Sequence, residues 1–226
     1  MARRERIYLS GHTYHVVQRG NNRQPVFLRP SDYIRYQDYL LDALLRYGVL
    51  CHAWVQMGNH VHLLLSPGDA DGISRVMSLL GNRYVQYFNR CYERTGTLWE
   101  GRHRGCVINT ERYLWACHRY IEMNPVRAGL VPRPEGYYWS SYASNALGVQ
   151  SELVTPHTSY LGLGGSDERR CRAYQRMFEC NALTENFDDI RGATRSGAAL
   201  GPSPGPMPRI GGGAFSVAEA QVTRYH

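Results

Sequence analysis

Lysine is absent from this chain of 226 residues, so all 26 of its Lys and Arg residues are arginine. Genome base composition can explain missing lysine, but it does not explain where the charge lies. Residues 1–149 hold 18 arginines against 11 acidic residues, whereas residues 150–226 hold eight of each, so the net charge of +7 belongs to the first two thirds. Because the planar guanidinium fork binds phosphates and stacks on bases, this distribution predicts a nucleic-acid partner.

Long apolar runs and paired cysteines are also missing. No run reaches the roughly 18 apolar residues of a membrane-spanning helix, and the arginine-rich start leads into no apolar signal core. The six cysteines include no Cys-x-x-Cys pair, which argues against a disulfide framework or a zinc ribbon. We therefore expect a soluble protein of the cytoplasm, without a membrane partner and associated with the nucleoid.

Alternating strand and helix patterns run through the first 124 residues. Turn-forming residues follow the first strand at Arg19–Asn22 and join the next two strands at Gly58-Asn59. Ser31 is a candidate N-cap of the first helix, and Pro125 should push Asn124 out of helical geometry. The predicted strands are 14–18, 50–57, 61–65 and 106–108, and the predicted helices are 31–47, 73–91 and 110–123.

This order, β-α-β-β-α-β followed by one more helix, predicts an α+β fold with a ferredoxin-like antiparallel sheet. The additional helix would carry side chains onto that sheet. Beyond residue 148 the patterns weaken, although 169–190 is compatible with one or two helices. We expect a core domain at 1–148, a C-terminal helical extension at 149–191 and a flexible Gly/Pro-rich tail at 192–226.

Two histidines stand two residues apart directly after the Gly58-Asn59 turn. On a strand, His60 and His62 point to the same face, while Val61 points to the other. Two neutral imidazoles at this spacing can supply neighbouring ligands to Mg²⁺, Mn²⁺ or Zn²⁺. The spacing alone is also typical of two polar residues on a solvated strand face.

The third predicted helix places Tyr120 and Asn124 four residues apart, and therefore next to each other on its surface. A tyrosine beside an apolar stripe is usually a half-buried core residue. Because the chain has 17 tyrosines, position alone does not nominate Tyr120 for chemistry.

Four separated motifs in matching order resemble the REP-associated tyrosine transposases, which are IS200-like single-tyrosine transposases of the HUH class. The likeness covers roughly residues 10–148, and one departure is Gly58, where the family commonly has proline. Glycine would loosen the hairpin but still permits a turn. The motifs are Gly58–Leu64, Gly96–Arg102, Tyr120–Val131 and Trp139–Tyr142.

The resemblance implies metal-assisted cleavage and rejoining of single-stranded DNA through a 5′-phosphotyrosine intermediate. In the family, the tyrosine matched by Tyr120 is the nucleophile, and the histidines matched by His60 and His62 bind a divalent metal, Mg²⁺ or Mn²⁺. Asn124 matches a polar residue that completes the metal site in related enzymes. The implied substrates are single-stranded hairpins of REP-like palindromes, and the active site would be built by a monomer or a homodimer.

Arginines beside these motifs are candidates for gripping the DNA backbone. Each one taken alone is more often an ordinary solvated charge, so the argument rests on the group. The candidates are Arg19, Arg23, Arg83, Arg102, Arg104 and Arg127.

Two other interpretations stay open at this point. A ferredoxin-like sheet can hold single-stranded nucleic acid without cutting it, as RNA-recognition folds do. The His-x-His pair on the clearest strand, where such folds display aromatic residues, favours an enzyme instead. A histidine-based metal hydrolase without a tyrosine nucleophile is the third possibility, and it would keep its activity after Tyr120→Phe.

Overall fold

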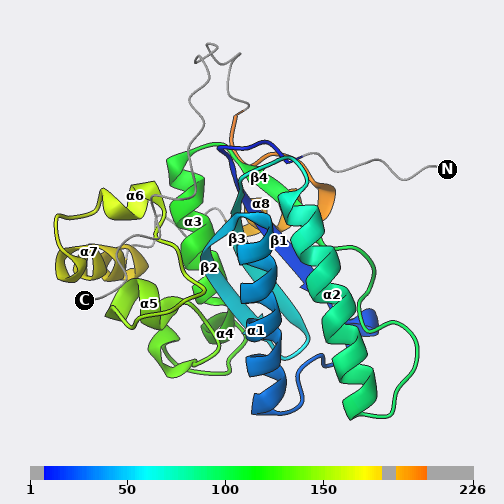
Figure 1. Ribbon diagram of the computed structural model, residues 1–226. Helices are drawn as coiled ribbons and strands as arrows, with labels where there is room; N and C mark the ends of the chain where they lie inside the picture. The colour runs from blue at the N-terminus through cyan, green and yellow to red at the C-terminus, as the bar shows by residue number, and fades with distance from the viewer. Residues whose placement is uncertain (1–7, 180–186, 203–226) are drawn as a thin grey trace, which may run out of the picture.

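The computed structural model describes residues 8–179 and 187–202, and its centre is a four-stranded antiparallel sheet (Figure 1). The strand order is β2-β3-β1-β4, which confirms the predicted ferredoxin-like sheet. Two residues, Gly58 and Asn59, join β2 to β3 as expected. The strands are β1 Thr13–Arg19, β2 Val49–Met57, β3 His60–Pro67 and β4 Arg104–Ile108.

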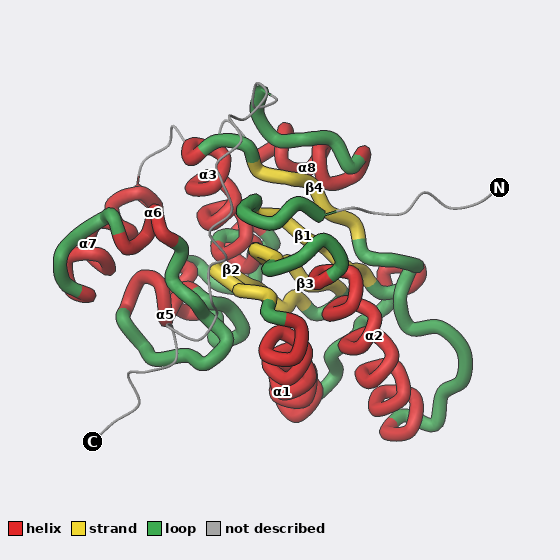
Figure 2. Tube along the Cα trace, turned by 45° about the horizontal axis from the view of Figure 1, so that its top comes forward, coloured by secondary structure: helices red, strands yellow, loops and turns green. Residues whose placement is uncertain are grey.

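One face of the sheet is covered by the two long helices α1, Pro30–Tyr47, and α2, Gly72–Cys91 (Figure 2). Alternate strand residues such as Val16, Val61 and Leu63 point into this layer and are buried there. The two helices pack on each other as well as on the sheet, and this layer holds the larger of the apolar cores.

The opposite face of the sheet carries α3, Glu111–Glu122, and α8, Phe187–Ser196. Thr110 caps α3, because its side chain accepts a hydrogen bond from the backbone N–H of Tyr113 at 3.3 Å. A short helix, α4, follows α3 directly at Asn124–Arg127. The face of the sheet toward α3 and α8 is where the candidate chemistry lies.

The remaining helices, α5, α6 and α7, gather beside α3 at one side of the molecule (Figure 1). A buried carboxylate, Glu122 at the end of α3, links α5 and α7 to α3. It accepts hydrogen bonds from Ser141 at 2.5 Å, Asn145 at 2.8 Å and Tyr174 at 2.8 Å. The bounds are α5 Tyr142–Leu147, α6 Thr158–Leu161 and α7 Asp167–Glu179, with 3₁₀ helices η1 at Asn21–Arg23 and η2 at Pro134–Gly136.

Three local expectations were wrong. The first helix begins at Pro30 rather than Ser31. Asp32 caps its start in place of Ser31, because the Asp32 carboxylate accepts hydrogen bonds from the backbone N–H groups of Leu28 and Arg29. Asn124 is not pushed out of helical geometry, because it begins the new helix α4 and Pro125 stands in the first turn of that helix, where proline is tolerated.

The expected flexible tail is also corrected where it is described. Residues 192–196 belong to α8, and Leu200 pairs with Ile108 at the edge of β4. Burial of Ile190, Ala193 and Leu200 against the sheet explains why a stretch poor in large apolar residues is ordered. The rest of that tail, 203–226, lies outside the described residues.

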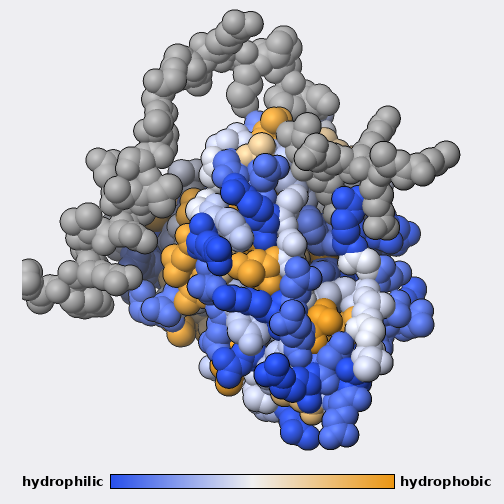
Figure 3. Space-filling model, turned by 45° about the vertical axis from the view of Figure 1, so that its right-hand side comes forward, coloured by the Kyte–Doolittle hydropathy of each residue, from blue (hydrophilic) through white to orange (hydrophobic). Residues whose placement is uncertain are grey.

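The surface shown in Figure 3 is mostly hydrophilic, with only small separate apolar patches among the described residues. Within residues 8–179 and 187–202, no helix combines the length and apolar character needed to cross a membrane.

Asp32 anchors the start of α1 to α2 from a fully buried position. Besides the two backbone N–H groups, its carboxylate accepts hydrogen bonds from Tyr87 at 2.9 Å and Tyr92 at 2.7 Å. We expect Asp32→Ala to lower the free energy of unfolding by about 3 kcal/mol, because four donors would be left without an acceptor. Urea denaturation measures this loss.

Asp38→Ala on the same helix is the matched control. Its carboxylate pairs with Arg35 at 3.6 Å and both side chains are about half exposed. An exposed pair of this kind contributes less than about 1 kcal/mol. Equal losses from the two variants would contradict the anchoring role of Asp32.

Glu122 should make stability depend on pH. Burial raises the pKa of its carboxyl from 4.5 to about 7, although its three hydrogen-bond donors oppose the shift. Between these two values the folded state holds a proton that the unfolded chain has released, so stability falls as pH rises through this window. Relative to Glu122→Gln, which stays neutral, the wild type should lose about 3 kcal/mol of unfolding free energy between pH 4 and pH 8.

Glu111→Gln removes a charge from the exposed start of the same helix and serves as the control. Denaturation curves at a series of pH values compare the three proteins. If the unfolding free energies of the wild type and of Glu122→Gln differed by the same amount at every pH, the raised pKa of Glu122 would be contradicted.

Candidate active site

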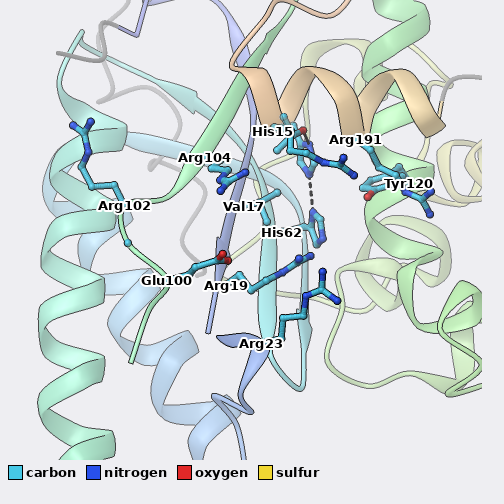
Figure 4. Close-up of a pocket in the computed structure, with 13 residues that line it drawn as sticks. His15, Val17, Arg19, Arg23, His62, Glu100, Arg102, Arg104, Tyr120 and Arg191 are labelled. Carbon is cyan, nitrogen blue, oxygen red and sulfur yellow. Dashed lines mark hydrogen bonds between the residues drawn. The ribbon is translucent and has the colours of Figure 1, made fainter. Parts of the chain in front are cut away.

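A cavity of about 660 Å³ opens on the face of the sheet that carries α3 and α8 (Figure 4). Residues from β1, β3, β4, α3 and α8 meet there, together with the loop before β4. Strand alternation brings them together, since the register pairs Val17 with His62 and Val17 with Arg104, so all three side chains share one face. The lining includes His15, His62, Tyr120 and Thr194, one acidic residue, Glu100, and the arginines 19, 23, 102, 104, 191 and 195.

His60 and His62 lie on the same face of β3, with ring centroids 5.0 Å apart. A third histidine, His15 of β1, stacks on His62 at 5.0 Å and accepts or donates a hydrogen bond through its Nε2 to His62 Nδ1 at 2.8 Å. His15 and His62 are both almost completely buried. The site therefore holds three imidazoles rather than the two that the sequence motif suggests.

Burial keeps these imidazoles neutral. It lowers the pKa of His60 to about 4, with the positive charge of Arg19 adding to the effect, and lowers the pKa of His15 to about 3. The pKa of His62 lies well below its usual range, first because of burial and then because of the neighbouring rings and arginines. Neutral imidazole is the form that binds metal ions.

The ring nitrogens of both motif histidines are arranged for a metal ion. The Nδ1 of His60 is hydrogen-bonded to Asn59 Oδ1 at 2.6 Å, and the Nδ1 of His62 to His15. Each ring thus has its Nδ1 engaged and its Nε2 left as the possible ligand. Among the described residues, no three His, Cys, Asp or Glu side chains form a complete metal centre. The two histidines fit Mn²⁺ or Mg²⁺ only if oxygen ligands complete the set.

Tyr120 of α3 borders the same cavity with 6% of its surface exposed. Its ring centroid lies 5.5 Å from that of His62 and 5.7 Å from that of His15. Phe187 of α8 packs edge-on against it at 5.3 Å, and the guanidinium of Arg127 lies 5.0 Å from the ring centroid. A phenol is therefore held beside the imidazoles by contacts on several sides.

The structure brings most of the predicted site residues to this cavity. Those that line it are Tyr120, His62 and the arginines 19, 23, 102 and 104. The side chain of Arg102 points away from the histidines in Figure 4. His60 lies directly beside His62, and Arg127 lies beside Tyr120. The cluster of positive charge suits a chain of phosphates.

Besides His60 and Arg127, two further predicted residues, Arg83 and Asn124, do not line the cavity. Arg83 lies on α2, on the other face of the sheet, where its guanidinium pairs with Asp42. Asn124 donates hydrogen bonds from its Nδ2 to the backbone oxygens of Tyr120, at 2.8 Å, and Ile121, at 3.4 Å. This leaves its Oδ1 as the atom for any metal contact.

Sequence reasoning missed His15, Phe187, Arg191, Thr194 and Arg195. His15 carried a usable signal, because it sits in the first strand with the alternation that puts it on the face of Val17. Arg191, Thr194 and Arg195 carried none, since they lie in or next to the stretch expected to form a tail. Phe187 lies in the expected helical extension, where no motif singled it out.

Comparison with known protein families shows which family the chain belongs to. The model of the family described as "Transposase IS200 like" matches residues 8–124, which include β1 to α3 and all three imidazoles. The chain belongs to the IS200-like transposase family. The family predicted from the four motifs is therefore confirmed, and this transposase has the family's role in moving DNA.

Two solved structures are similar to the chain, and the first of them shares its fold. One is a REP-associated tyrosine transposase bound to a REP hairpin, with 19% identity and a TM-score of 0.53; the match covers 70% of this chain and 93% of that one. Another, assigned as a transposase from Deinococcus radiodurans R1, has 23% identity and a TM-score of 0.38 over 54% of this chain and 96% of that one. The search of curated proteins found no match.

Proposed function

We propose that this transposase cleaves and rejoins single-stranded DNA by forming a covalent bond between Tyr120 and a 5′-phosphate. The observation that carries the proposal is the position of Tyr120 against His62 at one arginine-lined cavity. A phenol, neutral imidazoles and clustered guanidinium groups are the parts that phosphoryl transfer to a tyrosine requires.

In the proposed step, the Tyr120 hydroxyl oxygen attacks the scissile phosphorus and loses its proton. The bond between phosphorus and the 3′ oxygen breaks, and that oxygen takes up a proton to leave as a free 3′-hydroxyl. The product is a 5′-phosphotyrosine with the same number of phosphoester bonds as the substrate. Attack by another 3′-hydroxyl on this phosphotyrosine reverses the step, so strands are rejoined without an external energy source.

A divalent metal, when bound at His60, His62 and Asn124, supplies Lewis-acid polarisation of the phosphate. The chain itself contributes orientation. Arg127 and Phe187 hold the phenol ring, and Arg19, Arg23 and Arg104 surround the place that the DNA backbone would occupy. Backbone contacts of this kind set the register of a strand without reading its sequence.

The proposed substrates are hairpins formed by REP-like palindromes in single-stranded DNA. Support comes from the four motifs shared with the REP-associated transposases, and from the solved relative of the same fold, which is bound to a REP hairpin. Bases next to a hairpin are unpaired, so a single strand can reach the cavity without melting a duplex.

A covalent-adduct assay tests the nucleophile. Labelled single-stranded oligonucleotides from palindromes flanking the gene are incubated with Mn²⁺ or Mg²⁺ and separated on denaturing gels. We expect an adduct that maps to Tyr120 by peptide analysis, no adduct for Tyr120→Phe, and a loss of about 100-fold or more in rate for His62→Ala.

Tyr39→Phe is the matched control, because Tyr39 lies on α1 at the other face of the sheet and should leave the adduct unchanged. Persistent cleavage by Tyr120→Phe would favour a histidine-based hydrolase. Binding of these strands by the wild type without an adduct in either metal would favour a binding module.

DNA affinity should depend on the arginines of the cavity and not on those elsewhere. We expect Arg104→Ala to weaken binding of a single-stranded hairpin by about 3–10-fold at moderate salt, and to lower the slope of log affinity against log salt by about 0.7. Arg83→Ala is the control, since Arg83 pairs with Asp42 on the other face. Fluorescence anisotropy at several salt concentrations measures both, and equal effects would contradict the proposed position of the strand.

A further inference from the structure

A row of hydrogen bonds runs from α8 through β1 to β3 and ends at the cavity. The Thr194 hydroxyl lies 2.7 Å from the backbone oxygen of Ile190 and 2.9 Å from His15 Nδ1. The Nε2 of His15 lies 2.8 Å from His62 Nδ1 (Figure 4). Thr194, His15 and His62 border the cavity but are all buried, so little of their surface is open to competing water.

The proton positions along these hydrogen bonds can be assigned one after another, starting from the Ile190 carbonyl. Two oxygens 2.7 Å apart need a hydrogen between them, and the Ile190 carbonyl has none to give, so Thr194 donates its only proton there. The Thr194 oxygen must then accept from His15, which places a proton on His15 Nδ1. The Sγ of Cys106, 3.5 Å from the same oxygen, can only donate to it as well.

The proton position on His15 in turn fixes the proton position on His62. A buried neutral imidazole carries one ring proton, and in His15 that proton is on Nδ1, so the Nε2 of His15 accepts. A doubly protonated His15 would bury a charge without a counter-ion. His62 must therefore donate from its Nδ1, and its Nε2 is left with a lone pair.

We propose that Thr194 and His15 are positioning residues that hold His62 as the tautomer protonated on Nδ1, with Nε2 available to a metal ion. The metal part rests on the proposed function, whereas the tautomer does not. Thr194 lies outside the segment that matches the family, residues 8–124, so α8 completes the site of this chain.

A separate hydrogen bond, to Asn59, fixes the same tautomer in His60. Asn59 donates from its Nδ2 to the backbone oxygen of Arg23 at 3.0 Å, which turns its Oδ1 toward His60 Nδ1. Since an amide oxygen only accepts, His60 also carries its proton on Nδ1. Both motif histidines thus present Nε2, one through a local contact and the other through a helix far along the chain.

Nitrogen NMR of the full-length, metal-free protein labelled with ¹⁵N-histidine tests the tautomer directly. Long-range proton–nitrogen correlations distinguish Nδ1–H from Nε2–H, and the signals missing in His62→Gln assign His62. We expect Nδ1–H for His62 in the wild type and in Thr194→Ser, which keeps the hydroxyl. In Thr194→Val, which removes it, His62 should populate both tautomers.

Mn²⁺ binding, followed by the electron paramagnetic resonance signal of free Mn²⁺, is the second readout. We expect Thr194→Val to weaken Mn²⁺ binding by about 10-fold or more, and Thr194→Ser to stay within about 2-fold of the wild type. Circular dichroism checks that each variant is folded.

Wild-type His62 protonated on Nε2 would overturn the proposal, and this result needs no variant to fold. Equal behaviour of Thr194→Val and Thr194→Ser in the NMR spectra would overturn the part of Thr194. A wild type with the expected tautomer that binds no Mn²⁺ would instead contradict the metal site of the proposed function and leave the positioning role intact.

Discussion

The pairing of β1 with β3 at the centre of the sheet is the constraint on which the site depends. It sets Val17 opposite His62 and Arg19 opposite His60, so that imidazoles and guanidinium groups share the face toward α3 and α8. The alternate residues Val16 and Leu63 are buried against α1 and α2. Because side chains alternate with a period of two, a shift of β3 by one residue would turn His60 and His62 into that apolar layer and Leu63 toward α3 and α8.

Burial in the site has a chemical consequence as well as a structural one. His15 and His62 are neutral because they are buried, and a buried imidazole needs a partner for each ring nitrogen that does not face the cavity. The Thr194 hydroxyl is that partner for His15. Helix α8 is thereby tied to the face of the sheet that holds the cavity by the same hydrogen bonds that set the protons there.

Charge around the cavity is arranged asymmetrically. Six arginines and one glutamate line it, so its potential suits an anionic chain of phosphates, and Tyr120, His15 and His62 lie among these charges. Arg83 shows why the total number of arginines is a poor guide to such a surface. It lies near the same motifs in sequence, yet it pairs with Asp42 on the far side of the sheet.

The sequence by itself determined the order of strands and helices, the two-residue hairpin at Gly58-Asn59, the shared face of His60 and His62, and the helix that carries Tyr120. These are properties of neighbouring residues, set by periodicity and by turn and capping preferences. Only the tertiary structure decided that Thr194, 179 positions from His15, is hydrogen-bonded to it beside the cavity, and that Arg83 lies on the other face of the sheet. The reason is physical: α8 is held by burial of a few small and apolar side chains against a sheet formed elsewhere in the chain, and no local pattern encodes such a contact.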